Sequence, residues 1–206
     1  MNDENLIAEY RSRYKAQLVP IAERLSRELL QSLADLPRVD RVSVRAKDPD
    51  RFLKKAKKLK DGSLKYEAPL DQIQDQIGAR IIVFYLDDVE VVSKTLLRYF
   101  RSIETKALVP EETNRFGYVG QHYVMALTED LFDQGVDRSK LPQFFELQIK
   151  TLFQHAWSEA EHDLAYKPEL PLSADQERQV AFTAAQAWGA DHIFQALRTN
   201  LAQSVN

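Results

Sequence analysis

The residues best suited to chemistry begin with a basic segment in an otherwise acidic chain. Residues 41–60 carry nine Lys or Arg against two Asp, a net charge of +7, whereas the whole chain has a formal net charge of −3. Arg45 and Lys47 alternate along a predicted strand and therefore share one face, and Lys55 follows on the next predicted helix. A guanidinium can stack on a flat base, and ammonium groups can meet phosphates. A solvated helix face is the ordinary explanation of a charge run, but this spacing favours a local anion site.

Two carboxylates lie on predicted strands that are far apart in the sequence. Asp75 opens the pattern D-x-x-G-x-R at the entry of an apolar segment. Glu146 lies in a segment where polar and apolar residues alternate, so that Glu146, Gln148 and Lys150 share one strand face. A carboxylate opposite Asp75 can share a metal ion with it and accept a proton from an attacking hydroxyl. The ordinary alternatives are a turn cap for Asp75 and a plain solvent face for Glu146.

An aromatic residue between glycines forms the third pattern. Tyr118 follows Gly117 and precedes Gly120 and His122, at a loop that enters a predicted strand. An exposed tyrosine in such a loop offers a stacking surface for a base, worth roughly 1–3 kcal/mol in single-strand binders. A core tyrosine near a turn is the alternative.

The intervening sequence predicts the elements that hold these residues. Apolar residues at helical spacing predict a helix over about the first 36 residues, which Pro20 kinks or divides. The other predicted elements are a strand at 40–47, a helix at 48–58, a buried strand at 77–86, a helix at 89–100, strands at 103–109, 119–127 and 144–150, and helices at 151–166 and after residue 173. About five strands with helices between them predict an α+β (mixed α/β) fold.

Composition limits the class of protein. The chain has 206 residues, of which 44% are hydrophobic and 29% charged, which suits one domain over residues 1–206. We divide it into an N-terminal helical region (1–38), a core (39–167) and a C-terminal helical region (168–206). With six glycines, it has neither a dinucleotide-binding GxGxxG nor a P-loop. It has no cysteine, no apolar run of membrane-spanning length and no signal-peptide pattern at its start, so we expect a cytoplasmic protein without a membrane partner.

Together, the patterns resemble a known family. R-x-K…K, D-x-x-G-x-R, G-Y-x-x-x-H and E-x-Q-x-[RK]-T stand in the order of the synthetase domain of RelA/SpoT proteins, which make the alarmones (p)ppGpp. The likeness covers about Val42–Lys167 and includes the family's helix with its Trp, Glu-His and Tyr-Lys residues. The chain length resembles the stand-alone small alarmone synthetases. This resemblance implies a nucleotidyltransferase-like sheet of about five strands, flanked by helices that include N- and C-terminal ones.

The resemblance also implies an activity, the transfer of the β,γ-diphosphate of ATP to the ribose 3′-hydroxyl of GDP or GTP, with release of AMP. On the ATP side, Arg45 and Arg80 would sandwich the adenine. Lys47 and Lys55 would neutralise its phosphates.

For the reaction itself, the resemblance implies that Asp75 and Glu146 bind Mg²⁺ and that Glu146 is the base for the acceptor hydroxyl. Tyr118 would stack on the acceptor base, while His122 and Gln148 order the acceptor side.

Departures from the family pattern gather on the acceptor side. Gly120 stands where the family usually has Ser, and Asn114 stands where it commonly has Lys, although Arg115 is adjacent and can serve as the acceptor-side cation. Elsewhere, Lys150 replaces Arg. These departures leave the acceptor open.

Several alternatives stay open at this point. The acceptor can be an adenine nucleotide, or the 3′ end of tRNA as in a toxin-like relative, or the chain can be a non-catalytic nucleotide-binding regulator. A metal site is conceivable on a helical stripe of His155, Glu159, His162 and Tyr166. The apolar residues of the last helix can pack on the domain or on a second copy of the chain, so a homo-oligomer is possible.

Overall fold

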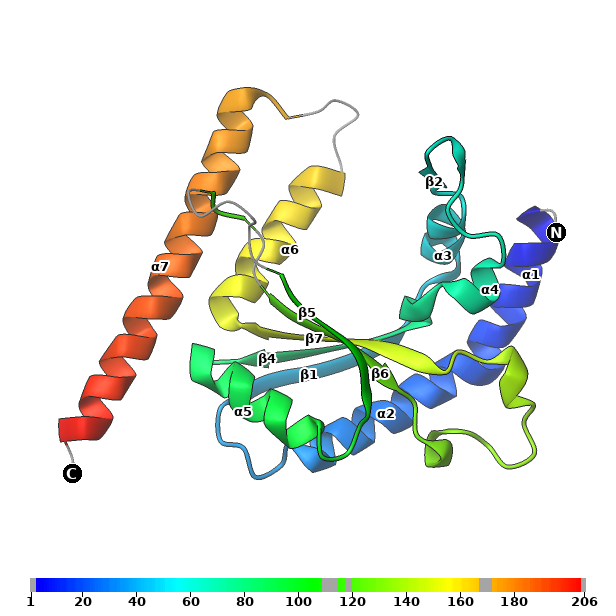
Figure 1. The fold of residues 1–206 in the computed structure, drawn as a ribbon, viewed down its shortest axis with the longest axis horizontal. Coiled ribbons are helices and arrows are strands. Elements are labelled where there is room, and N and C mark those ends of the chain that lie inside the picture. The colour runs from blue at the N-terminus through cyan, green and yellow to red at the C-terminus, as the bar shows by residue number, and fades with distance from the viewer. Residues whose placement is uncertain (1–2, 109–114, 118–119, 167–171, 205–206) are drawn as a thin grey trace.

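A computed structural model of the chain describes residues 3–108, 115–117, 120–166 and 172–204. Within these ranges, the centre is a mixed sheet of five strands in the order β1-β4-β7-β6-β5 (Figure 1). The strands are β1 (Val39–Ala46), β4 (Ile77–Val83), β5 (Ser102–Leu108), β6 (Gly120–Ala126) and β7 (Phe144–Thr151). β4 and β7 run parallel, and the other neighbouring pairs run antiparallel. The predicted mixed fold is therefore confirmed.

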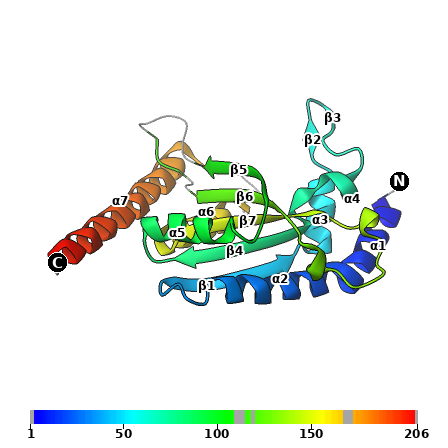
Figure 2. The same ribbon diagram turned by 60° about the horizontal axis from the view of Figure 1, so that its bottom comes forward.

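Helices flank this sheet on both faces. They are α1 (Asp3–Arg13), α2 (Val19–Ser32), α3 (Pro49–Ala56), α4 (Pro69–Gln72), α5 (Leu86–Leu96), α6 (Leu152–Tyr166) and α7 (Ala174–Ser204). Shorter elements are the 3-10 turns η2 (Gln74–Gln76), η3 (Glu129–Leu131) and η4 (Arg138–Lys140), and a hairpin of β2 (Leu59–Lys60) and β3 (Ser63–Leu64). α2 and α6 lie on opposite sides of the sheet, and α7 extends past its edge (Figures 1 and 2). No helix in the described ranges is long and apolar enough to cross a bilayer.

The first helical region is divided just before its proline, as predicted. A π-helical segment, η1 (Tyr14–Leu18), separates α1 from α2, and Pro20 lies in the first turn of α2. Proline has no N–H to donate and its ring clashes with the preceding turn, so the α-helical ladder cannot pass through it unchanged.

Alternation along the central strands separates a core face from a polar face. Ile81 of β4 and Leu147 of β7 are fully buried, whereas their neighbours Arg80 and Gln148 lie on the opposite face. The helices that complete the core contribute Ile21, Leu25 and Leu29 from α2 and Val92 and Leu96 from α5. The face left outside this core carries the predicted site residues.

The central strand ends earlier than the sequence predicts. β4 stops at Val83 and α5 begins at Leu86, although the apolar run continues through this point. The carboxylate of Asp88 accepts a hydrogen bond from the backbone N–H of Tyr85 at 3.3 Å and pairs with Arg38 at 2.8 Å. This cap fixes the start of α5 before the predicted residue 89.

Tyr10 joins the N-terminal helix to the strand end that carries Lys47. Its buried ring stacks on Phe52 with centroids 3.7 Å apart, and its hydroxyl donates to the carbonyl oxygen of Lys47 at 2.9 Å. We expect Tyr10→Phe to lower the free energy of unfolding by about 1 kcal/mol, the value of one hydrogen bond. Tyr10→Ala should lower it by about 3–5 kcal/mol, because it also leaves a cavity.

Urea denaturation measures both losses. Tyr99→Ala, at a residue that is 58% exposed, is the control and should cost less than about 0.5 kcal/mol. Equal losses for the two Tyr10 variants would contradict the packing role of the ring.

Candidate functional site

Strand register brings the predicted site residues into rows on the polar face of the sheet. Gly78 of β4 is paired with Arg45 of β1 on one side and with Glu146 of β7 on the other. The neighbouring row consists of Arg80, Gln148, His122 and Lys106. Directly paired Cβ atoms lie about 5 Å apart and diagonal ones about 7–8 Å apart. The sheet therefore brings together residues that are distant in the sequence, such as Arg45 and Glu146, which are 101 positions apart.

Asp75 is held between the two predicted phosphate-binding lysines. Its carboxylate lies 2.9 Å from Nζ of Lys47 and 2.8 Å from Nζ of Lys55. Lys47 follows the end of β1, where its backbone N–H donates to the carbonyl oxygen of Gln76 at 2.8 Å. Lys55 lies on α3, whose first turn is capped by the carboxylate of Asp48. Two cations and one carboxylate from three elements thus form one cluster.

Glu146 is an ionised, oriented carboxylate beside this cluster. Its Oε1 lies 3.1 Å from Nδ1 of His122 and 3.3 Å from Nε2 of Gln148. The hydrogen bond from His122 lowers the pKa of Glu146, despite the opposing effect of burial, and Gln148 and Lys55 act in the same direction. Glu146 is therefore charged at neutral pH and available to a cation or a proton.

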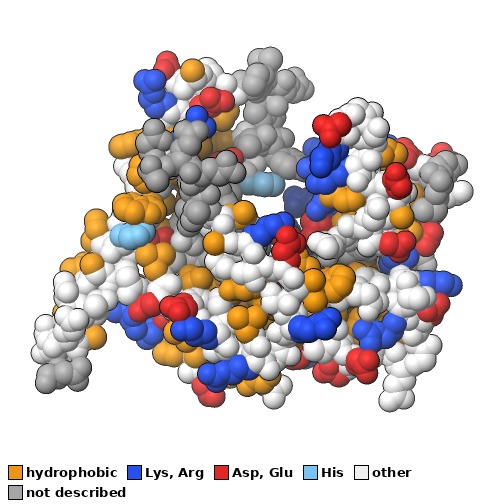
Figure 3. Space-filling model, in the orientation of Figure 1, with side chains coloured by type: hydrophobic (Ala, Val, Ile, Leu, Met, Phe, Trp, Pro, Cys, Tyr) orange, Lys and Arg blue, Asp and Glu red, His pale blue; other side chains and the backbone are white. Residues whose placement is uncertain are grey.

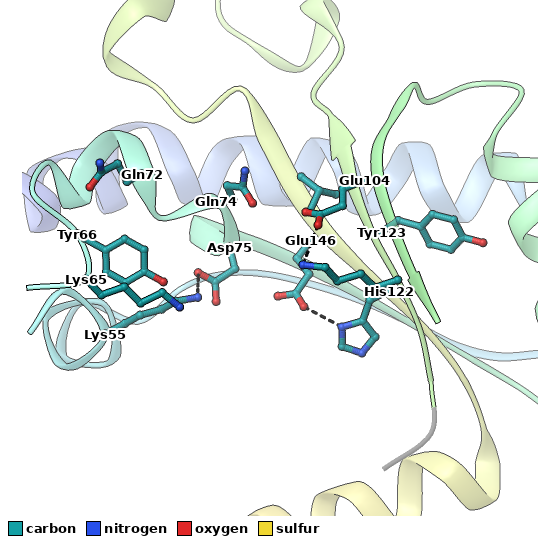
Figure 4. Close-up of a pocket in the computed structure, with 12 residues that line it drawn as sticks. Lys55, Lys65, Tyr66, Gln72, Gln74, Asp75, Glu104, His122, Tyr123 and Glu146 are labelled. Atoms are coloured by element: carbon teal, nitrogen blue, oxygen red, sulfur yellow. Dashed lines mark hydrogen bonds and ion pairs between the residues drawn. The ribbon is translucent and has the colours of Figure 1, made fainter. Parts of the chain in front are cut away.

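A cleft of about 430 Å³ opens over these residues. Asp75 and Glu146 both line it, with Lys55 reaching Asp75 and His122 reaching Glu146 (Figure 4). In the space-filling view, this face is hollowed between the arm that carries α3 and the β2–β3 hairpin and the arm that carries α6 (Figure 3). The predicted carboxylate pair therefore shares one solvent-accessible cavity with Lys55 and His122.

Asp75 and Glu146 carry the kind of ligand that Mg²⁺ prefers. Among the described residues, no group of three or more His, Asp or Glu is arranged to hold a metal. An ion bound as the family resemblance implies would have Asp75 and Glu146 as its protein ligands, and both line the cleft. Mg²⁺ is commonly bound by one or two carboxylates and completes its shell with water and substrate phosphates. Mg²⁺ remains a prediction that the donor set favours.

Two other basic residues of the polar face pair with α6. Arg80 Nη1 lies 2.6 Å from Oε1 of Glu159, and Lys150 Nζ donates to the hydroxyl of Ser158 at 2.9 Å. Burial lowers the pKa of Lys150 to about 8, and the charge of Arg80 adds to this effect. Glu159 belongs to the helical stripe that the sequence suggested as a conceivable metal site, but it forms an ion pair with Arg80. The described residues form no metal cluster there.

The predicted acceptor residues are only partly placed. His122 and Gln148 lie beside Glu146, as above. Arg115 lies on the exposed loop before β6, and Tyr118 lies outside the described residues. Gly120, which departs from the family pattern, is buried at the start of β6 opposite Leu108.

Sequence reasoning missed several residues that line the cleft. Lys65 and Tyr66 follow the β2–β3 hairpin, while Glu104 and Lys106 project from β5. The hairpin has a readable signal, an Asp-Gly turn with φ angles of 52° and 81°. Alternation on β5 places Glu104 and Lys106 on one face, but only the sheet order shows that this face is the face of the site.

Gly78, the glycine of the pattern D-x-x-G-x-R, lies beside open space. Nothing lies within 4 Å of the position where a Cβ would be. The glycine therefore leaves open space between Arg45 and Glu146.

Lys150 generates a prediction on stability. Its folded-state pKa is about 8 and its ordinary value is 10.5, so between these pH values the unfolded chain binds more protons. The free energy of unfolding should therefore rise with pH across this window. Lys150→Met should remove this rise and stabilise the protein at pH 7 by an amount on the order of 1–3 kcal/mol.

Urea denaturation of both proteins at pH 7 and pH 10 measures the effect. Lys94→Met, at a lysine whose side chain is 68% exposed, is the matched control and should leave the pH dependence unchanged. A rise with pH that persists in Lys150→Met would rule out Lys150 as its source.

Solved structures share this fold. The small alarmone synthetase 1 from Bacillus subtilis matches with a TM-score of 0.73 at 20% identity, over 89% of this chain and 95% of that chain. Its structure bound to its product pppGpp gives a TM-score of 0.70 at 21% identity (95% and 97%), and that bound to AMPCPP gives 0.65 at 20% (90% and 96%). A GTP pyrophosphokinase family protein from Streptococcus pneumoniae gives 0.66 at 21% identity, over 98% and 92%.

At these identities, the structural likeness shows a shared fold. No curated protein matches the sequence. The model of a region found in RelA / SpoT proteins, however, matches residues 44–170, which include Asp75, Glu146 and the basic residues around them. Because this match spans more than half of the chain, the protein belongs to the RelA/SpoT family.

Proposed function

We propose that this protein transfers the β,γ-diphosphate of ATP to the ribose 3′-hydroxyl of GDP or GTP. The observation that carries the proposal is the cleft in which Asp75, paired with two lysines, lies beside the ionised and hydrogen-bonded Glu146. In phosphoryl transfer, a protein mainly positions the reactants and stabilises charge, and this constellation suits both tasks. The related synthetase of B. subtilis was solved with pppGpp, its product, and with AMPCPP.

ATP would lie over β1 and β4. Arg45 and Arg80 occupy diagonal positions on these strands, because Arg45 is paired with Gly78 and Arg80 with Ser43. A diagonal spacing of about 7–8 Å suits a flat base between two guanidinium planes. The open space at Gly78 would leave room for the nucleotide.

The phosphates of ATP would replace Asp75 as the ion-pair partner of Lys47 and Lys55. Lys47 and Lys55 already converge on one anionic group at 2.9 and 2.8 Å, so an incoming phosphate finds both cations in place. Asp75 would then be released to bind Mg²⁺ together with Glu146. When bound, the ion would neutralise phosphate charge as it develops.

Glu146 would remove the proton from the acceptor. The 3′-oxygen forms a bond to the β-phosphorus, the bond from that phosphorus to the α,β-bridging oxygen breaks, and AMP leaves with the electron pair. The proton of the hydroxyl passes to the carboxylate of Glu146. His122 and Gln148 would hold this carboxylate in one orientation through their hydrogen bonds.

The first test follows AMP release and the fate of γ-labelled ATP with Mg²⁺ and either GDP or GTP. We expect equal amounts of AMP and labelled acceptor, and no reaction after chelation of Mg²⁺. Glu146→Gln should lower kcat by about 10²–10⁴-fold, because the general base is removed, while binding of AMPCPP stays within a few-fold.

Glu104→Gln is the matched control, since this carboxylate lines the same cleft but pairs with Lys106. The loss of kcat in Glu104→Gln should be far smaller than in Glu146→Gln. Label that appears only in tRNA would replace the proposal with a toxin-like activity, and label only in adenine nucleotides would replace the acceptor. AMPCPP binding without any transfer would indicate a nucleotide-binding regulator.

The open space at Gly78 provides a second test. Gly78→Val should leave the free energy of unfolding within about 1 kcal/mol of the wild type, because β-branched residues suit a strand and no atom lies within 4 Å of the new Cβ. The added methyl groups would nevertheless fill space between Arg45 and Glu146. We expect the Kd of AMPCPP to rise at least about tenfold, a loss near 1.4 kcal/mol, measured by calorimetric titration.

Gly78→Ala, with a smaller side chain, should give an intermediate Kd. Wild-type affinity in Gly78→Val would show that the nucleotide does not lie over this strand.

A further inference from the structure

The long C-terminal helix contacts the loop that precedes β6. The ring of Trp188 on α7 meets the ring of Phe116 edge-on, with centroids 5.8 Å apart and an interplanar angle of 65°. The two side chains are 47% and 42% exposed, so this contact lies at the surface and not in the core. Phe116 lies four residues before Gly120, the first residue of β6.

α7 is anchored to the rest of the protein on both sides of Trp188. Towards its N-terminus, Nε1 of Trp157 on α6 donates to the hydroxyl of Thr183 at 3.1 Å. On the other side, the hydroxyl of Thr151 donates to the carboxylate of Asp191 at 2.8 Å, and Asp191 is only 2% exposed. These hydrogen bonds fix the position of Trp188 relative to α6 and to the end of β7.

One of these hydrogen bonds reaches the catalytic strand. Thr151 is the last residue of β7, the strand that carries Glu146, and its hydrogen bond holds α7 against the end of that strand. Further along α7, the ring of Phe194 stacks on that of Phe153 with centroids 5.6 Å apart. α7 thus spans from the end of β7 to the loop before β6, which are the two parts that must be placed relative to one another in the proposed reaction.

We propose that Trp188 is a positioning residue for the acceptor nucleotide. It acts through Phe116, which belongs to the loop before β6, the strand that carries His122. The inference rests on the proposed function, because the acceptor is assigned to this side of the sheet. The C-terminal helix thus contributes to acceptor binding and contributes nothing to ATP binding.

The first experiment separates the two substrates kinetically. In Trp188→Ala, the KM for GDP and GTP should rise by about 2- to 13-fold, the value of one aromatic pair, while the KM for ATP stays within twofold. Trp188→Phe keeps an aromatic ring and should restore most of the loss. Leu201→Ala is the control: it removes an exposed apolar side chain (68%) about 20 Å further along α7 and should change neither KM.

Phe116→Ala tests the contact from the loop side. It should raise the same KM values, and the double variant with Trp188→Ala should be little worse than either single variant, because both remove one interaction. Additive losses, or equal rises in the KM of ATP and of the acceptor, would overturn the proposal.

Fluorescence gives a readout that needs no turnover. Titration of GDP or GTP into the wild type should change tryptophan emission, titration of AMPCPP should change it far less, and the response should vanish in Trp188→Phe. A response that survives in Trp188→Phe, or no response at all, would contradict the proposal. Failure of the proposed function is distinct, because it appears as wild-type protein that releases no AMP with either acceptor.

Discussion

The register of β4 against its two neighbours is the constraint on which the rest of this structure depends. Side chains alternate with a period of two, so a slip of β4 by one residue would turn Arg80 into the core and expose Ile81. Full burial of an aliphatic side chain stabilises a protein by about 1.5–3 kcal/mol, and several such residues line the core face of β4 and β7. Apolar packing therefore determines where the charged residues of the site are placed.

Asp75 reduces the electrostatic repulsion between Lys47 and Lys55. A site for phosphates needs several cations close together, and these repel one another when no anion is present. The side chains of Lys47 and Lys55 are only 20% and 29% exposed, which weakens the screening by water. The carboxylate between them offsets the repulsion and keeps both ammonium groups directed at one point. Under the proposed function, phosphates replace this carboxylate, so the cations need no reorganisation when the substrate arrives.

Much of the fold and part of the site could be predicted from local pattern, because alternation and helical spacing report which face is buried. The sequence places Glu146 and Gln148 on one strand face, and the structure agrees. What local pattern cannot supply is pairing between distant segments. The ion pair of Arg80 with Glu159 joins residues 79 positions apart, and it depends on how α6 crosses the sheet. The sequence pattern also does not reveal whether a neighbouring backbone or open space lies beside Gly78. The structure shows open space.

The sheet order separates the two proposed substrates. The residues proposed for ATP belong to one end of the sheet: Arg45 lies on β1, Lys47 directly after it, Lys55 on α3 and Arg80 on β4. His122, proposed for the acceptor, belongs to β6. β7 lies between β4 and β6, so Glu146 stands where the two halves meet. In the proposed reaction, a hydroxyl from one half attacks a phosphorus from the other in line, and Glu146 on the shared strand would serve as the base. Under the proposed function, the acceptor half, with its loop and α7, can therefore vary while the β4–β7 pair that holds Glu146 stays the same.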